Sequence, residues 1–397
     1  MRAVVIHHNL NTPGGEATVA IETMQCLSEL GFDVELLTVQ RPDLKRLTRA
    51  YGKEIRVDRI REILPFKMDF FGMYQRLLTI LSSLNLGARD IIVNTNGSAM
   101  PYGTRRNNVR CILYLHFATS LLGSSCYCSL IGNKYQKSFF WKAYFRPYQA
   151  ITNVFTKSAI ATSQMTLTNS RFSREAIMKA YPGVDPCVLY PPIDIERFSP
   201  AYHSRCRTSQ VLIIARFSPE KQLEKAIKIA KILKDLEFTI IGSLTPANRP
   251  YFTSLQKMIS NYGLQKMVRL IPNATNQELI DEMSASTVYL HTMAGEHFGI
   301  SIVEAMAAGL VPVVPTYGGC SEIVPSEFQY GTLEEAARHI SKNIEGYDKE
   351  KRRLLYQTAT QFSPFRFRKM MQQYIEQVCK IHKVKESSLD ALIMRQE

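Results

Sequence analysis

The chain has 397 residues, with 49 lysines and arginines against 35 acidic residues, a formal net charge of +14, and 45% of its residues are hydrophobic. This length predicts a folded protein of two domains whose cores need neither disulfides nor metal ions for stability, which excludes a small stapled scaffold. The eight cysteines are scattered without a C-x-x-C pair. This pattern indicates reduced thiols and argues against a structural zinc site.

Two stretches bear on the expected location of the protein. The longest weakly polar stretch, residues 300–315, is interrupted by Glu304, Gly309 and Pro312, so we expect no transmembrane helix. The opening MRAVVIHHN turns polar after a few apolar residues, too soon for the core of a secretory signal. We therefore expect a cytoplasmic protein.

The positive charge is concentrated in the first half of the chain. Residues 91–174 contain no acidic side chain and ten basic ones, a field that attracts polyanions. Within it, residues 134–157 carry the basic aromatic run FFWKAYFRPY, which suits the surface of an anionic membrane. A core aromatic face with a solvated basic face is an equally weighted alternative. Zinc-finger spacing, an RNP aromatic pattern and an RNA-binding G-x-x-G context are absent from the sequence, so we expect no nucleic-acid partner.

Strand and helix patterns alternate along the chain. In the first half, strands are expected at residues 3–7, 33–39, 90–94 and 111–116, and a loop at 11–16 leads into a helix at 17–31. A polar linker follows near residue 190. The second half predicts strands at 211–215, 238–242, 268–272, 288–292 and 311–315, helices at 224–236, 251–263, 276–286 and 300–309, and a final amphipathic helix at 366–384. This alternation predicts two Rossmann-like α/β domains with parallel sheets, residues 1–200 and 201–365.

The most specific motif is GEHFGISIVEAMAAGLVPVVPTYGGCSEIV, at residues 295–324. A strand runs into a loop and then into a helix that is expected to begin near Ser301. The backbone N–H groups of residues 298–303, which include Phe298 and Ile300, would be free there and, with the helix dipole, would bind a phosphate. Gly299 would let that ligand approach the backbone closely.

Two glutamates flank this helix start. Glu304 is expected in the first helical turn, where its carboxylate could accept hydrogen bonds from the hydroxyls of a ribose. A lone glutamate in a first turn more often complements the helix dipole than binds a ligand. Glu296 precedes the loop and could accept hydrogen bonds from sugar hydroxyls.

The E-x7-E spacing in this context resembles the retaining glycosyltransferases of family 4, which have the GT-B architecture. The matching residues are Glu296, Phe298, Gly299, Ile300, Glu304, Ala305, Met306, Ala307 and Gly309. The resemblance implies two doubly wound domains that face each other across a cleft, with a C-terminal helix of about residues 366–397 crossing back to the first. It also implies transfer of mannose or glucose from a GDP- or UDP-hexose, used as a substrate without any further cofactor.

Further elements match the family along the chain. Arg216 and Lys221 look like its R-x4-K element, where two cations neutralise the leaving diphosphate. The loop with Gly14 and Gly15 is similar to the family's first Gly-rich loop near the diphosphate. His116, in LYLHF, matches the histidine that the family places beside the transferred sugar. Ser170 or the asparagine before it is expected to cap a helix.

The segments TNSRFS, VLYPPIDIERF, ARFSPEKQ and HTMAGEHFGISIVEAMAAG together resemble the α-1,2-mannosyltransferases of this family that extend lipid-pyrophosphate-linked oligosaccharides. This likeness implies a polyprenyl-linked glycan as acceptor, in N-glycan or surface-glycan assembly, and peripheral contact with the cytoplasmic membrane face through residues 134–157.

The absence of a D-x-D pair predicts that no metal ion is required, because Arg216, Lys221 and the helix N-terminus can supply the positive charge. Other chemistries stay open. The same fold could act on a soluble acceptor or as a phosphorylase or epimerase. A non-enzymatic binder of polyanions or membranes, based on residues 91–174 alone, is the alternative of another class.

Overall fold

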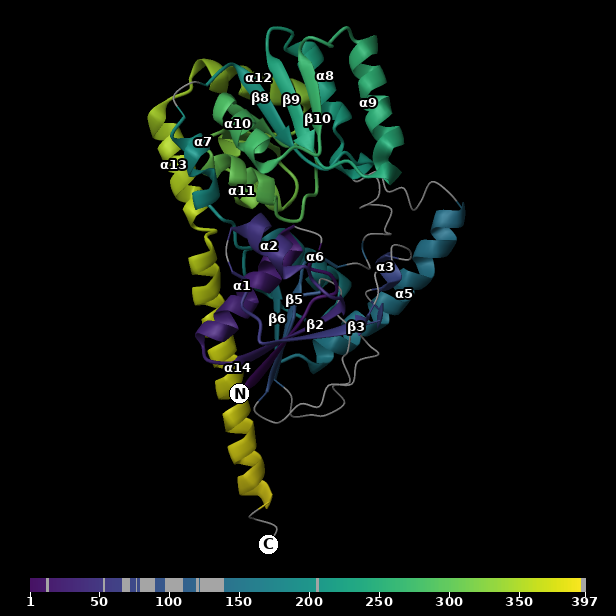
Figure 1. The fold of residues 1–397 in the computed structure, drawn as a ribbon, viewed down its shortest axis with the longest axis vertical. Coiled ribbons are helices and arrows are strands. Elements are labelled where there is room, and N and C mark those ends of the chain that lie inside the picture. The colour runs from purple at the N-terminus through teal and green to yellow at the C-terminus, as the bar shows by residue number, and fades with distance from the viewer. Residues whose placement is uncertain are drawn as a thin grey trace. The chain divides into compact units, whose positions relative to one another are not determined.

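The computed structural model describes residues 1–11, 14–52, 54–65, 72–75, 77–78, 90–96, 110–118, 121, 139–204 and 207–393 (Figure 1). The chain divides into two compact units. Unit 1 comprises residues 1–123, 143–192 and 364–397, and unit 2 comprises residues 124–142 and 193–363. The predicted domain boundaries at residues 200 and 365 lie close to these divisions and stay a prediction.

Unit 1 is built on a parallel sheet in the order β3-β2-β1-β4-β5-β6-β7. Its described strands are β1 (Arg2–Ile6), β2 (Asp33–Gln40), β3 (Arg59–Leu64), β4 (Ile91–Asn94), β5 (Arg110–Leu115), β6 (Met165–Thr168) and β7 (Cys187–Val188). In β1 the register pairs Val4 with Glu35 of β2 and with Ile92 of β4. The central strands are continuous apolar runs because helices cover both faces of such a sheet.

The described helices of unit 1 are α1 (Gly15–Glu29), α2 (Leu44–Tyr51), α3 (Gly72–Gln75), α5 (Phe139–Thr162), α6 (Arg171–Ala180) and α14 (Pro364–Ile393), although the first residues of α5 are grouped with unit 2. Ser170 is the N-cap of α6, and its side chain accepts a hydrogen bond from the N–H of Ser173 over 3.0 Å. This confirms the predicted cap, which satisfies one of the unpaired N–H groups of the first turn.

The C-terminal helix returns to unit 1, as the resemblance implies, and packs there on α1. Figure 1 shows α14 in yellow beside α1 in purple, and Phe367, Met371 and Ile375 of α14 belong to the same buried core as α1. The guanidinium of Arg368 donates to Glu22 over 2.6 Å, and the Glu22 side chain is almost fully buried. Residues nearly a whole chain length apart are thus joined in one core.

Unit 2 is built on a second parallel sheet in the order β10-β9-β8-β11-β12-β13. Its strands are β8 (Gln210–Ile214), β9 (Glu237–Gly242), β10 (Val268–Pro272), β11 (Val288–Leu290), β12 (Val311–Pro315) and β13 (Gln329–Tyr330). Its described α-helices are α7 (Ser199–Tyr202), α8 (Glu224–Ile232), α9 (Arg249–Asn261), α10 (Asn276–Ala285), α11 (Ile300–Ala307), α12 (Leu333–Glu345) and α13 (Lys349–Thr360). The predicted fold class, two α/β units with parallel sheets, is confirmed.

A half-buried arginine, Arg207, holds the C-terminal end of α11 in place. Arg207 donates to the carbonyl oxygens of Ala201, Met283 and Ala308 over 2.7, 3.0 and 2.6 Å. Two of these carbonyls belong to the C-terminal ends of α10 and α11, where no intrahelical N–H is available to them. The guanidinium therefore fixes both helices to the segment that enters unit 2.

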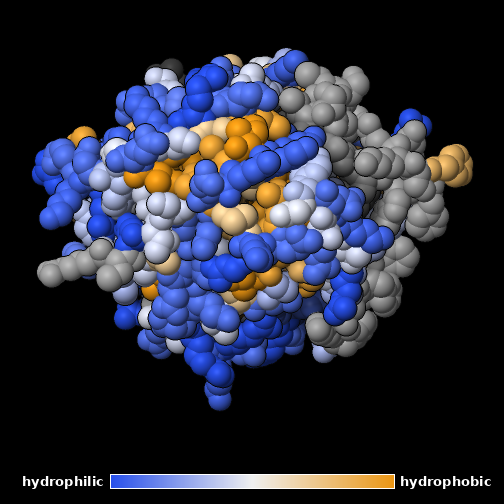
Figure 2. Space-filling view, turned by 90° about the horizontal axis from the view of Figure 1, so that it is seen from above, coloured by the Kyte–Doolittle hydropathy of each residue, from blue (hydrophilic) through white to orange (hydrophobic). Residues whose placement is uncertain are grey.

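Within the described residues, no helix is both long enough and apolar enough to cross a bilayer. Figure 2 shows one face of the molecule, where apolar side chains gather in the middle and hydrophilic ones surround them.

Candidate active site

The loop between β11 and α11 is held backbone to backbone by the loop after β12. The N–H of Gly295 donates to the carbonyl of Tyr317 over 2.8 Å, and the N–H of Gly319 donates to the carbonyl of Glu296 over 2.7 Å. A Cβ atom at Gly319 would lie 2.1 Å from the carbonyl oxygen of His297. Only glycine allows this approach, so the GGC sequence after β12 positions Glu296.

Helix α11 begins at Ile300, with Gly299 as its N-cap at a φ of 104°, in the left-handed region that favours glycine. Its first turn differs from the prediction in one respect. The N–H of Ile302 donates to the carbonyl of Gly299 over 3.0 Å, so it is not free to bind a ligand. A tightened first turn of this kind uses an i→i+3 hydrogen bond.

The side chains of Lys221 and Glu296 contact each other. Lys221 follows β8, in the short 3-10 helix Pro219–Lys221, and its Nζ donates to Glu296 Oε2 over 2.5 Å. Each side chain is 16% exposed. The carbonyl of Lys221 accepts from the hydroxyl of Thr292 over 2.6 Å, which ties this loop to the end of β11. The resemblance assigns the two residues to different parts of the donor, whereas here they form one ion pair.

The charge of Glu296 is stabilised by its neighbours. Burial alone would raise its pKa, but Lys221, His291 and His297 together hold the pKa well below the usual range of a carboxyl group. Glu296 is therefore an anion at neutral pH.

His291 shares this carboxylate. Its Nε2 lies 3.6 Å from Glu296 Oε2, and its side chain is almost fully buried. Burial lowers the pKa of His291 to about 4, with Glu296 opposing this effect and Lys221 adding to it. The imidazole is therefore neutral at neutral pH.

Three other residues predicted to bind the donor, Arg216, Phe298 and Ser301, also belong to unit 2. Arg216 is 66% exposed and contacts Glu220 at 3.7 Å. Ser301 lies in the first turn of α11, with its Oγ 2.8 Å from the Tyr289 hydroxyl. The side chain of Phe298 is buried, so any contribution to an anion site comes from its backbone.

Glu304 lies one turn later than predicted. Because α11 begins at Ile300, Glu304 is the fifth helical residue and falls outside the first turn of 3.6 residues. Burial raises the pKa of Glu304, with Arg197 opposing this effect and Asp194 adding to it. A carboxylate in this position gains little from the helix dipole, whose effect falls off within the first turn.

The remaining predicted residues belong to unit 1. Gly14 is the N-cap of α1 and Gly15 its first residue, and the N–H of Gly14 donates to the Tyr51 hydroxyl over 3.4 Å. His116 directly follows β5, is 8% exposed, and its ring centroid lies 4.8 Å from that of Tyr114.

Two families match the chain. Glycosyltransferase Family 4 matches residues 13–197, and Glycosyl transferases group 1 matches residues 194–361. Each family match covers less than half of the chain, and the two matches adjoin and together span residues 13–361.

Several curated relatives of this chain are named GDP-Man:Man(3)GlcNAc(2)-PP-Dol alpha-1,2-mannosyltransferase. The Dictyostelium discoideum protein is 26% identical over 298 residues, which cover 66% of this chain and 58% of the relative. The Mus musculus protein is 31% identical over 192 residues, which cover 44% of this chain and 39% of the relative. The chain thus spans about half of the length of these relatives.

Solved structures share the GT-B fold with this chain. Anabaena HepE in complex with UDP and glucose is 18% identical, with a TM-score of 0.68, and the match covers 95% of this chain and 99% of that one. Sucrose-phosphate synthase from Thermosynechococcus elongatus is 14% identical, with a TM-score of 0.71 and the same coverage.

Sequence reasoning missed three residues of this candidate site, Tyr289, His291 and Thr292. All three lie in VYLHT, which was interpreted only as a strand. The signal that could have found them is the polar pair His-Thr at the end of an otherwise apolar strand, shortly before Glu296. The end of a parallel strand lies at the carboxyl edge of the sheet, where ligands of such folds bind.

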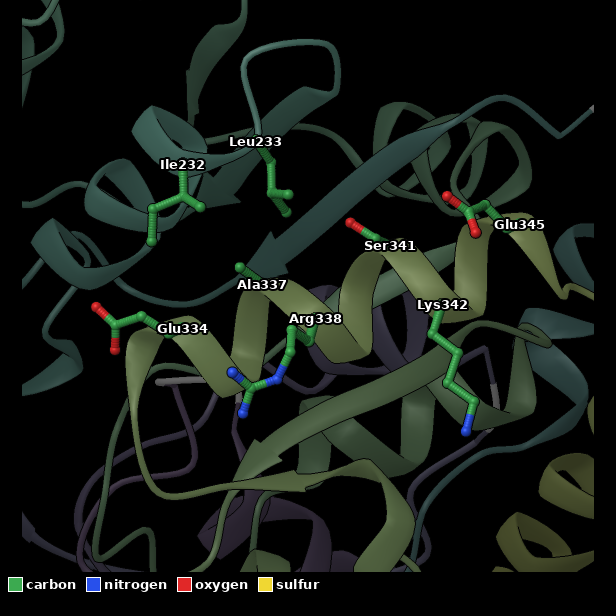
Figure 3. A pocket seen from close by; sticks show the side chains of 8 residues that line it. All are labelled: Ile232, Leu233, Glu334, Ala337, Arg338, Ser341, Lys342 and Glu345. Atoms are coloured by element: carbon green, nitrogen blue, oxygen red, sulfur yellow. The ribbon is translucent and has the colours of Figure 1, made fainter.

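A groove of ≈ 510 Å³ lies elsewhere in unit 2 (Figure 3). Ile232 and Leu233 at the end of α8 face Ala337 and Ser341 of α12, with Glu334 and Glu345 at opposite ends. Its lining shares no residue with the site. No group of three or more metal-ligating side chains occurs among the residues that the structure describes.

Proposed function

We propose that this protein is a glycosyltransferase, which transfers mannose from GDP-mannose to a hydroxyl of a polyprenyl-linked glycan, with retention of the anomeric configuration, at the cytoplasmic face of a membrane. The names of the curated relatives support the donor and the acceptor. The observation that carries the proposal is the ion pair between Lys221 and Glu296 at the carboxyl edge of the sheet of unit 2, beside the start of α11.

The donor would be held by charge and by backbone. Lys221 and Arg216 on the loop after β8 bind the diphosphate together with backbone N–H groups around Gly299, and Glu304 binds the ribose. The family resemblance assigns Gly14 and Gly15, at the start of α1, to binding of the diphosphate. In this structure the Lys221 ammonium contacts the Glu296 carboxylate. When the donor binds, the ammonium has to leave this carboxylate and contact a phosphate of the donor.

The chemistry needs an anion near the anomeric carbon. Positive charge develops there as the bond to the diphosphate breaks, and the ionised Glu296 stabilises it in a partly buried site where charge interactions are strong. The leaving phosphate oxygen takes the proton of the incoming hydroxyl on the same face of the sugar, which gives retention without an enzyme nucleophile. The family resemblance assigns His116 to contact with the transferred sugar. The reaction would be metal-independent, with Lys221 and Arg216 neutralising the leaving group.

A thermal-shift panel of GDP, UDP and ADP, with and without EDTA, tests the donor. A ligand at a hundredfold excess over its Kd stabilises the fold by about 2.7 kcal/mol. We expect a shift with GDP that survives EDTA. Transfer of radiolabelled mannose from GDP-mannose to a lipid-linked oligosaccharide, with digestion of the product by an α-1,2-mannosidase, then tests acceptor and linkage. A shift by UDP alone, or a shift abolished by EDTA, would contradict the proposal.

The exposed side of α5 supports the membrane contact. Phe139 is 88% exposed and Val154 is 66% exposed, and Arg146 and Lys157 are exposed on the same helix. The helix contains no acidic residue. Apolar side chains next to cations suit an anionic surface. Residues 134–138 of the predicted segment lie outside the described residues.

Flotation with vesicles of phosphatidylcholine, with and without phosphatidylserine, tests this contact. We expect binding to the anionic vesicles, and a clear loss of binding for Val154→Glu. Met178→Glu is the matched control, because Met178 is an exposed apolar residue on α6, 41% exposed. Equal losses in both variants would argue against a specific role for α5.

A further inference from the structure

His291 occupies a fixed position between two elements of the site. Its backbone N–H donates to Val313 of β12 over 2.9 Å, and its carbonyl accepts from the Tyr330 hydroxyl over 2.7 Å. Its ring is buried, with Nδ1 lying 3.3 Å from the Tyr289 hydroxyl and Nε2 lying 3.6 Å from Glu296 Oε2. These hydrogen bonds fix the backbone, and the buried ring lies between Tyr289 and Glu296.

The neighbours of the ring select one tautomer. A neutral imidazole carries one proton, on Nδ1 or on Nε2. A lone pair on Nε2 would face the negative Glu296 carboxylate, so the proton belongs on Nε2. Nδ1 then accepts from Tyr289, whose hydroxyl stays protonated because burial raises its pKa.

The same logic orients the next hydroxyl. Tyr289 has a single O–H, and it is directed to Nδ1 of His291. The Ser301 hydroxyl, 2.8 Å from the Tyr289 oxygen, must therefore be the donor in that contact. The result is a one-directional series of donors, from Ser301 at the start of α11 through Tyr289 and His291 towards Glu296.

Lys221 and His291 meet Glu296 at the same oxygen atom, Oε2, at 2.5 and 3.6 Å. At 3.6 Å the histidine does not form a hydrogen bond while Lys221 is in place. Under the proposed function, Lys221 leaves this oxygen for the donor diphosphate. We propose that His291 is a positioning residue: when Lys221 turns to the diphosphate, the Nε2–H of His291, oriented by Tyr289, holds the Glu296 carboxylate in place for the sugar.

Protein with ¹⁵N-labelled histidine rings tests the tautomer without any transfer assay. A long-range ¹H–¹⁵N spectrum should show His291, assigned by its loss in His291→Gln, as a neutral ring protonated on Nε2 at pH 7. Saturating GDP should move the Nε2 signal. Lys221→Met should show the moved signal without GDP, because the competing ammonium is gone. A ring protonated on Nδ1, an imidazolium at pH 7, or the same Nε2 signal in Lys221→Met and the wild type would overturn the proposal.

Kinetics test the consequence for the reaction. His291→Ala should lower kcat by about 10- to 100-fold, the scale expected when a reacting group is misplaced by about 1 Å. The KM for GDP-mannose should change little. His291→Gln, whose amide N–H reaches a similar place, should recover most of the lost kcat, which a purely structural role would not predict. Wild-type kcat in His291→Ala would overturn the proposal.

The two proposals fail in different ways. If the wild-type protein binds GDP but transfers no mannose, the proposed function fails and the tautomer experiment still decides the role of His291. If transfer proceeds normally and the ring is protonated on Nδ1, only the role of His291 is wrong.

Discussion

Lys221 and Glu296 are separated by 75 positions in the chain, yet the ammonium of one donates to the carboxylate of the other over 2.5 Å. The contact joins the loop after β8 to the loop after β11, and these strands are neighbours in the sheet of unit 2. The Lys221 ammonium favours the ionised form of the partly buried Glu296 carboxylate. This negative charge lies where the proposed reaction develops positive charge.

Glu296→Gln should abolish most of the transfer activity. The amide has nearly the same volume but no charge, so it cannot stabilise positive charge at the anomeric carbon. We expect kcat to fall by about 100- to 1,000-fold, the range for removal of one electrostatic stabiliser. The measurement is the initial rate of mannose transfer at saturating donor. Glu334→Gln removes the same charge from an exposed position on α12 and should keep the wild-type rate. A Glu296→Gln enzyme with most of its activity would refute this role.

Acidification should destabilise the wild-type protein through His291. Its folded pKa of about 4 lies below the ordinary value of 6.5, so the unfolded chain binds a proton that the folded chain resists between these values. Stability therefore falls as the pH falls from 6.5 to 4, by an amount on the order of 2 kcal/mol at pH 5. His291→Gln should lose this part of the pH dependence. The test compares the unfolding free energies of both proteins at pH 7 and pH 5. Parallel losses would show that His291 is not responsible.

Arg368→Ala should destabilise unit 1. Arg368 is 25% exposed and Glu22 only 1% exposed, so the substitution removes the guanidinium from a buried carboxylate. Breaking such a pair costs on the order of 3 kcal/mol. Thermal unfolding should show a lower Tm. Arg353→Ala breaks an exposed pair with Glu350 on α13 and should leave the Tm nearly unchanged. An equally small effect of Arg368→Ala would mean that apolar packing alone holds α14 on α1.

Two glycines should respond differently to alanine. At Gly14 the φ of 164° is extended backbone, and a Cβ atom would meet nothing within 4 Å, so Gly14→Ala should fold normally. A loss of GDP-mannose affinity in this variant would indicate that the donor approaches the backbone there.

At Gly319 the Cβ atom would collide with the backbone of His297, so Gly319→Ala should lower the Tm. Thermal unfolding and the donor KM of both variants separate these effects, and normal donor affinity in Gly14→Ala would contradict the predicted role of the first Gly-rich loop.

Local pattern determined much of the fold. The apolar runs at residues 211–215, 238–242, 268–272 and 311–315 correspond to β8, β9, β10 and β12, because a buried parallel strand is a short continuous run of apolar residues. The short edge strands β7 and β13 were not predicted, because two residues carry no periodicity. The E-x7-E motif was readable because its two glutamates lie on one loop and the helix that follows it.

Only the tertiary structure decided how the site is assembled. The contact of Lys221 with Glu296, the approach of Gly319 to His297 and the position of His291 each depend on loops from different strands that meet at one edge of the sheet. A linear sequence records which residues alternate between buried and exposed positions within one element. It does not record that Lys221 and His291 contact the same atom, Oε2 of Glu296. Such contacts depend on strand order and register, which arise only when the elements pack together.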